Sequence, residues 1–155
     1  MAVKVIDETT VEELDLPGRR LRWVVTNENT GAKYCTMAVI RIAPGQKVRP
    51  AHSHPNGEEV IYILNGHGRV LVNGEVELVK AGCAVLFPQG EIHMLQNLSD
   101  EEMKVIMKLA VNTLDRLLWQ RECDPVAYHE QLAFGRHYTS HWDDPELRRL
   151  TSTGN

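Results

Sequence analysis

The stretch His52-Ser53-His54-Pro55-Asn56-Gly57-Glu58-Glu59 contains two histidines two residues apart, followed by a turn and two acidic residues. In an extended segment, residues two apart point to the same face, so the two imidazoles aim together. The Pro-Asn-Gly turn then reverses the chain and brings Glu59 back beside them. His93 follows a separate Pro-Gln-Gly turn and can join the group from a neighbouring strand.

His52, His54, Glu59 and His93 together offer three imidazoles and one carboxylate. These ligand types suit borderline divalent metals, so the expected cofactor is one Fe, Mn, Ni, Zn, Co or Cu ion, with its identity open. A metal that prefers five or six ligands would keep at least one position for water or substrate beside these four. A catalytic site requires such an open position. Glu58 offers an alternative carboxylate for the same position.

The residues around these histidines are patterned as short strands separated by turns. Asn73-Gly74 is a two-residue hairpin signal that needs positive φ at both positions. Short strands joined by Gly, Pro and Asn turns predict an all-β barrel or jelly roll. The expected strands are residues 22–26, 34–43, 48–54, 59–64, 69–72, 76–79, 83–87, 92–96 and 103–111.

The length of 155 residues suits one domain. We expect an N-terminal arm over residues 1–20, the barrel over residues 21–112 and a short, partly helical tail over residues 113–155. The tail is too aromatic for a disordered segment, so it should pack on the barrel as a lid or meet a second subunit. Its aromatic residues are Trp119, Tyr128, Phe134, Tyr138 and Trp142.

Composition and charge exclude several classes of partner. The formal charge is −4 and no basic cluster appears, so we expect no nucleic-acid partner. No apolar run is long enough to cross a bilayer and the N-terminus does not read as a secretory signal, so we expect no membrane association. Cys35, Cys83 and Cys123 are too widely spaced for a disulfide framework, which favours buried thiols in a reducing, cytoplasmic setting.

Two sets of spacings match the paired motifs of one family. The first motif is Gly45, His52, His54, Glu59 and Gly66, with the gap between Gly45 and His52 one residue longer than usual. The second is Gly82, Pro88, Gly90, His93 and Asn97, with every spacing kept. Over roughly residues 35–112 the chain thus resembles the cupins, a superfamily of small double-stranded β-helix (jelly-roll) barrels.

The resemblance implies that His52, His54, Glu59 and His93 bind the metal. The six residues between Glu59 and Gly66 favour Glu59 over Glu58, which would then point away from the site. The resemblance also places the four motif glycines at turns that need positive φ or close backbone approach. It gives Asn97 a structural role near a strand end.

The resemblance further implies a divalent-metal-dependent enzyme acting on a small polar molecule, of the dioxygenase, isomerase, lyase or decarboxylase type. Glu59 is then also the candidate catalytic residue, because it could leave the metal or accept a proton during turnover. The alternative is a non-catalytic protein that uses the metal to bind a sugar or carboxylate. Cupins often pair through their sheets, so a homodimer is expected.

Other residues are weaker candidates. Tyr62 lies on the strand face opposite Glu59 and is expected to pack, and Phe87 is expected to fill core. Arg41 and Arg49 could anchor an anionic substrate, although alternation turns Arg49 away from His52 and favours a surface role. A tail folded over the barrel mouth could bring an acid or base to the substrate from His129, His137 or His141.

Overall fold

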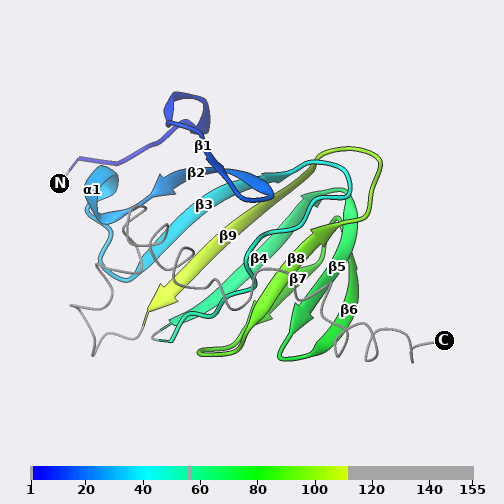
Figure 1. Cartoon of the computed structure of the whole chain (residues 1–155). Helices are drawn as coiled ribbons and strands as arrows, with labels where there is room; N and C mark the ends of the chain where they lie inside the picture. The colour runs from blue at the N-terminus through cyan, green and yellow to red at the C-terminus, as the bar shows by residue number, and fades with distance from the viewer. Residues whose placement is uncertain (1, 56, 112–155) are drawn as a thin grey trace.

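The computed structural model describes residues 2–55 and 57–111 (Figure 1). This part of the chain forms two antiparallel sheets, with strand orders β1-β2-β3-β9-β4-β7 and β6-β5-β8. Helical structure in it is limited to a 3-10 turn and one short α-helix. The elements are η1 (Glu8–Thr10), β1 (Leu14–Leu16), β2 (Arg19–Val25), α1 (Asn27–Thr30), β3 (Cys35–Ile42), β4 (Gly57–Asn65), β5 (His67–Val72), β6 (Glu75–Lys80), β7 (Ala84–Phe87), β8 (His93–Asn97) and β9 (Met103–Val111).

The all-β jelly-roll expectation is confirmed. β9, the last strand of the described residues, lies between β3 and β4 in the larger sheet, as Figure 1 shows. Along β4, buried and exposed side chains alternate strictly from Gly57 to Leu64. The inner faces of both sheets form one apolar core, because alternation directs every second side chain inward. Its largest fully buried members include Leu21, Ile42, Ile61, Ile63, Met103, Met107 and Leu109.

Residues 48–54 differ from the prediction, because they do not form a continuous strand. Pro50 has no N–H to donate, and the Arg49 N–H bonds to the Pro17 carbonyl at 3.1 Å instead of extending a ladder along β8. The prediction of a strand there was therefore wrong, although the segment still runs beside β8. Two isolated bridges hold this part of the chain beside β8. One joins His52 to His93, and the other joins Lys47, just before the segment, to Gln96.

The turn predictions are confirmed by the backbone angles. Asn73 and Gly74 have φ values of 46° and 88°, and the hairpin joins β5 to β6. The four motif glycines all have φ between 72° and 89°. At Gly66 an added Cβ would also approach Ser99 and Met103 closely. Both the positive φ and the lack of space therefore exclude larger residues at this position.

The tail over residues 113–155 lies outside the described residues, together with its expected helices, Cys123, His129, His137 and His141. Within the described ranges, no helix has the length and apolarity needed to span a membrane. Cys35 and Cys83 are free and only half-buried, so both are more accessible than the expected buried thiols.

Candidate metal centre

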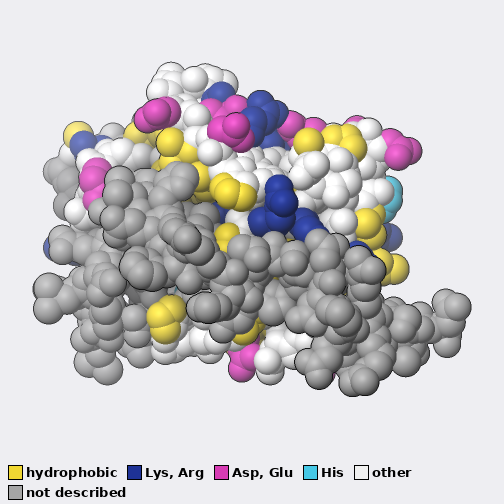
Figure 2. Space-filling model, viewed as in Figure 1, with side chains coloured by type: hydrophobic (Ala, Val, Ile, Leu, Met, Phe, Trp, Pro, Cys, Tyr) yellow, Lys and Arg dark blue, Asp and Glu magenta, His cyan; other side chains and the backbone are white. Residues whose placement is uncertain are grey.

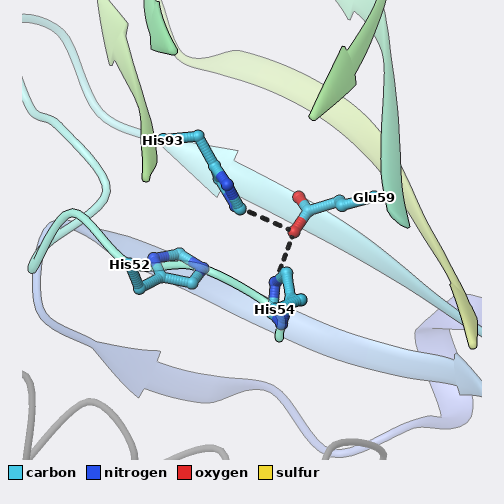
Figure 3. Close-up of side chains that lie close together, drawn as sticks. All are labelled: His52, His54, Glu59 and His93. Atoms are coloured by element: carbon cyan, nitrogen blue, oxygen red, sulfur yellow. Dashed lines mark hydrogen bonds and ion pairs between the residues drawn. The ribbon is translucent and has the colours of Figure 1, made fainter. Parts of the chain in front are cut away.

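Four side chains converge inside the barrel: His52, His54, Glu59 and His93 (Figure 3). Each offers one ligand atom, and these atoms all lie within 4.8 Å of one another. His54, Glu59 and His93 are buried, whereas His52 is half-buried and is the most accessible member of the group. The cluster could therefore hold one metal ion, with His52 on its more open side.

Backbone hydrogen bonds bring the histidines together from distant parts of the chain. The His52 N–H donates to the His93 carbonyl at 3.1 Å, and the His93 N–H donates back to the His52 carbonyl at 2.8 Å. The Gly90 N–H donates to the His54 carbonyl at 2.9 Å, which ties the turn before β8 to the turn before β4. Glu59 comes from β4 and closes the group from the larger sheet.

Two of the imidazoles are held in a tautomer suited to metal binding. Nδ1 of His52 lies 3.1 Å from the Pro50 carbonyl, and Nδ1 of His93 lies 2.9 Å from the Glu91 carbonyl. A carbonyl only accepts, so the Nδ1 atom of each ring carries a proton, and Nε2 is the ring nitrogen that could bind a metal. Backbone contacts of this kind orient metal-ligating histidines in proteins.

Glu59 is the negative group of the cluster. Its Oε2 lies 2.8 Å from Nε2 of His54 and 3.3 Å from Nε2 of His93 (Figure 3). Burial by itself would raise the pKa of this carboxyl, but the two histidine contacts outweigh burial and bring the pKa of Glu59 well below its ordinary value. Glu59 is thus an anion at neutral pH, as a carboxylate ligand must be.

His52 is kept neutral by its surroundings. Its pKa lies well below 6.5, first because the ring loses hydration and then because His93 and His54 are close. Glu59 opposes this lowering, and the positive charge of Arg19 adds to it. Three imidazoles and one carboxylate form the donor set that borderline divalent metals prefer.

Arg19 is a residue that sequence analysis missed. It is only 4% exposed, and its Nη1 donates to the Arg49 carbonyl at 3.2 Å. The alternation of Arg19 with buried Leu21 and Trp23 along β2 was the available signal, because it places all three on the inner face. The structure therefore adds a buried cation near the histidines.

Phe87 contributes to the site itself, beyond filling core. Its ring stacks on His93 with centroids 4.2 Å apart and an interplanar angle of 3°. Phe87 pairs with Glu59 across β7 and β4, so the same strand contact positions a carboxylate and the ring that supports an imidazole. The stacking fixes the ring plane of His93 and excludes water from one of its faces.

The remaining candidates lie away from the cluster. Glu58 is exposed on the outer face of β4, on the side of the strand opposite Glu59. Tyr62 is 46% exposed on that same outer face, which contradicts its expected packing role. Arg49 is exposed. Arg41 forms ion pairs with Glu8 and other acids near the N-terminal arm, so it does not face the cluster.

Asn97 has the structural role that was expected. Its Nδ2 donates to the carbonyls of Ile42 at 2.9 Å and Glu101 at 2.8 Å, and its Oδ1 accepts from the Ser99 N–H at 2.8 Å. The side chain thereby fastens the end of β8 to the end of β3 and to the loop before β9. Such a fully bonded buried amide holds the two sheets in register.

Sequence comparison agrees with this geometry. A family model described as "Cupin domain" matches residues 38–109, which contain all four clustered residues. The chain belongs to the cupin superfamily. Among curated relatives of this cupin, "Polyketide synthase CurC" of Streptomyces cyaneus is 28% identical over 110 residues, which are 71% of either chain. An oxalate decarboxylase of Arthroderma benhamiae is 32% identical over 83 residues, but these are 50% of this chain and 19% of that one.

Solved structures share the cupin fold. A protein described as a predicted oxalate decarboxylase from Thermotoga maritima superimposes with a TM-score of 0.63 at 21% identity, covering 70% of this chain and 99% of that one. KdgF from Halomonas sp. gives a TM-score of 0.59 at 15% identity, covering 72% of this chain and 96% of that one. At these identities the likeness establishes the fold alone.

Proposed function

We propose that this chain is a divalent-metal-dependent cupin enzyme that acts on a small oxygen-bearing molecule. The observation that carries the proposal is the cluster itself: four ligand atoms within 4.8 Å, with three of the four residues buried. Metal ligation explains why three imidazoles and a carboxylate are gathered there, since burying such groups without a shared partner is costly. The metal ligands proposed are His52, His54, Glu59 and His93.

The chain's own residues would prepare this site for chemistry. His52 and His93 present Nε2 because their Nδ1 protons are held by backbone carbonyls. Phe87 and the buried Leu109, which both pair with Glu59 across neighbouring strands, keep water from the inner wall. A divalent metal bound there supplies Lewis-acid polarisation of a substrate oxygen and, if it is redox-active, access to dioxygen chemistry.

Glu59 is also proposed as the catalytic residue, and its pKa limits how it can act. Because the contacts with His54 and His93 lower that pKa, the carboxylate is a weak proton acceptor while both contacts last. Proton transfer to Glu59 Oε2 would therefore follow the loss of a histidine contact during turnover. The ligand role requires no such rearrangement and is the better supported of the two.

The relatives direct the first substrates to test. Two of them carry the names of polyketide synthase proteins, and others are named oxalate decarboxylases. The chain should therefore be loaded separately with Fe²⁺, Mn²⁺, Zn²⁺ and Ni²⁺ and offered oxalate and aromatic hydroxyketones. Product formation is followed by mass spectrometry and dioxygen uptake by an electrode.

The proposal expects turnover by the native chain and by Glu58→Gln, whose altered residue is exposed on the outer face. It expects no turnover by His93→Ala. Saturable binding of the compounds without any product, in every metal form, would instead favour a non-catalytic binding protein. Equal turnover by His93→Ala would contradict the metal-site assignment.

We further propose that the chain forms a homodimer in a reducing, cytoplasmic setting. Several large apolar side chains are exposed on the outer face of β4 and β7, where Val60 pairs with Leu86. β7 is also an edge strand, so a second copy could cover both features. Light scattering that gives a single 17.6 kDa particle would contradict the dimer.

A further inference from the structure

Thr36 on β3 carries a hydroxyl that the fold leaves without a partner. Its side chain is 0% exposed. Among residues 2–55 and 57–111, no group hydrogen-bonds to Thr36 Oγ1. A buried hydroxyl without a partner destabilises a fold, and valine has nearly the same shape and equal preference for strands. The position of Thr36 therefore needs an explanation other than packing.

Thr36 lies in the same cross-strand row as the metal cluster. It pairs with Leu109 on β9, Leu109 pairs with Glu59 on β4, and Glu59 pairs with Phe87 on β7. All four residues are buried, so their side chains share the inner face of the larger sheet. Two strand spacings, about 10 Å, separate the backbones of Thr36 and Glu59.

Within this row, the apolar Leu109 lies between two polar residues, Thr36 and Glu59. Leu109 separates the hydroxyl of Thr36 from the carboxylate of Glu59. Next to Thr36 on the inner face of β3 is Ala38, which pairs with buried Trp23 on β2. A ligand that reaches both the Thr36 hydroxyl and the metal cluster must therefore place an apolar, ring-sized body against Leu109 and near Trp23.

We propose that Thr36 Oγ1 hydrogen-bonds to a distal oxygen of a ring-sized substrate whose other end is held at the His52, His54, Glu59 and His93 cluster. This inference rests on the proposed metal site and deepens it. The substrate class it names is an aromatic or alicyclic hydroxyketone with oxygens at opposite ends. A two-carbon acid such as oxalate is too short to bridge the row, so Thr36 does not contribute to its binding.

The test uses two probes that differ in one oxygen. Ortho-hydroxyacetophenone chelates a metal through its phenol and ketone oxygens, and resacetophenone adds one hydroxyl para to the acetyl group. Affinities for the zinc-loaded full chain are measured by calorimetry for the native protein, Thr36→Val and Thr36→Ser. Zinc uptake is measured first, and the melting temperature of each metal-free variant is recorded.

In Thr36→Val, resacetophenone should bind about 5- to 10-fold more weakly, and ortho-hydroxyacetophenone within about twofold of its native affinity. Thr36→Ser keeps the hydroxyl and should retain the native preference for resacetophenone. Metal-free Thr36→Val should melt about 2–6 °C higher, because it no longer buries the hydroxyl.

Three results would overturn the inference. Zinc uptake with the same affinity for both probes in the native chain and Thr36→Val would overturn it while leaving the metal site intact. A lower melting temperature for Thr36→Val would show that the hydroxyl already has a stabilising partner. Failure to take up zinc would overturn the proposed metal site and this inference together.

Discussion

Charged and ionisable side chains gather in two regions of this molecule, and the two regions are built differently. The metal cluster lies inside the barrel and has one carboxylate among three imidazoles. The second region, here called the arm network, lies on the outer face beside the N-terminal segment and joins carboxylates to guanidinium and ammonium groups. It consists of Glu8, Glu13, Glu102, Arg20, Arg22, Arg41 and Lys104.

The arm network joins three carboxylates to four basic side chains and is partly hydrated. Glu8 contacts Arg41 at 3.0 Å and Lys104 at 2.6 Å, and the hydrogen bond from Lys104 is the main reason that the pKa of Glu8 is lowered. Its side chains keep between 17% and 47% of their surface exposed. Figure 2 shows acidic and basic side chains next to one another at the upper edge of the molecule.

In the metal cluster, imidazoles contact the carboxylate where guanidinium and ammonium groups do so in the arm network. Its carboxylate is held by two imidazoles, and its least buried histidine is pushed toward the neutral form. Charge pairing at the surface fastens the arm, whereas the buried cluster gathers the groups that the proposed metal ion would join.

The largest effect is expected from Glu59→Gln. Removing the only carboxylate of the cluster should weaken metal affinity at least about 100-fold, which corresponds to about 2.8 kcal/mol. Affinity is measured by competition with a chromophoric chelator. Glu58→Gln is the matched control, because this adjacent carboxylate is exposed on the other face of β4. Equal losses in both variants would show that the effect is not one of ligation.

An intermediate effect is expected from acidification of the metal-free chain. The pKa of His52 is lowered in the folded state, so the unfolded chain binds a proton near pH 6.5 that the folded chain does not. Stability should therefore fall as the pH drops below about 6.5, and fall again below about 4.5, where unfolded Glu59 takes up its proton. Urea denaturation at a series of pH values measures both losses.

Two histidine variants assign the first loss. His52→Gln should lose less stability than the native chain between about pH 7.5 and 5.5. His67→Gln is the control variant, because His67 is exposed at the start of β5 and lies outside the cluster. A native stability that rises on acidification through this range would contradict the pKa direction given for His52.

The smallest effect is expected in the arm network. Arg41→Gln should lower stability by about 1 kcal/mol or less, because its ion pairs are partly hydrated. Metal content should stay unchanged, because Arg41 does not face the cluster. Lys108→Gln serves as the control, since no ion pair within the described residues involves this exposed lysine. Urea denaturation and elemental analysis report the two quantities, and loss of metal from Arg41→Gln would show that the regions are coupled.

The parts of the molecule that the sequence predicted well are those controlled by local chemistry. Asn73-Gly74 produced the expected hairpin because few residues tolerate positive φ at two successive positions. The six residues between Glu59 and Gly66 favoured Glu59 over Glu58, and along β4 Glu59 is buried while Glu58 is exposed. Asn97 could be assigned a structural role from the resemblance to the cupins.

The parts that sequence reasoning missed depend on contacts between distant segments. Residues 48–54 alternate like a strand, but the Arg49 N–H pairs with Pro17, thirty-two residues earlier in the chain. Arg19 and Thr36 were missed for a related reason, because a polar residue in a strand is ordinarily assigned to the solvent face. The burial of both side chains in the folded chain places them inside the barrel.

The central claim is that the cluster of His52, His54, Glu59 and His93 holds a metal. Elemental analysis of the full chain, purified without added metal or a nickel column, tests it most directly, with His93→Ala as the control. The account predicts about one equivalent of a divalent transition metal in the native chain and almost none in the variant. A native chain that contains no metal, and takes none up on titration with Fe²⁺, Mn²⁺, Ni²⁺, Co²⁺, Cu²⁺ and Zn²⁺, would contradict it.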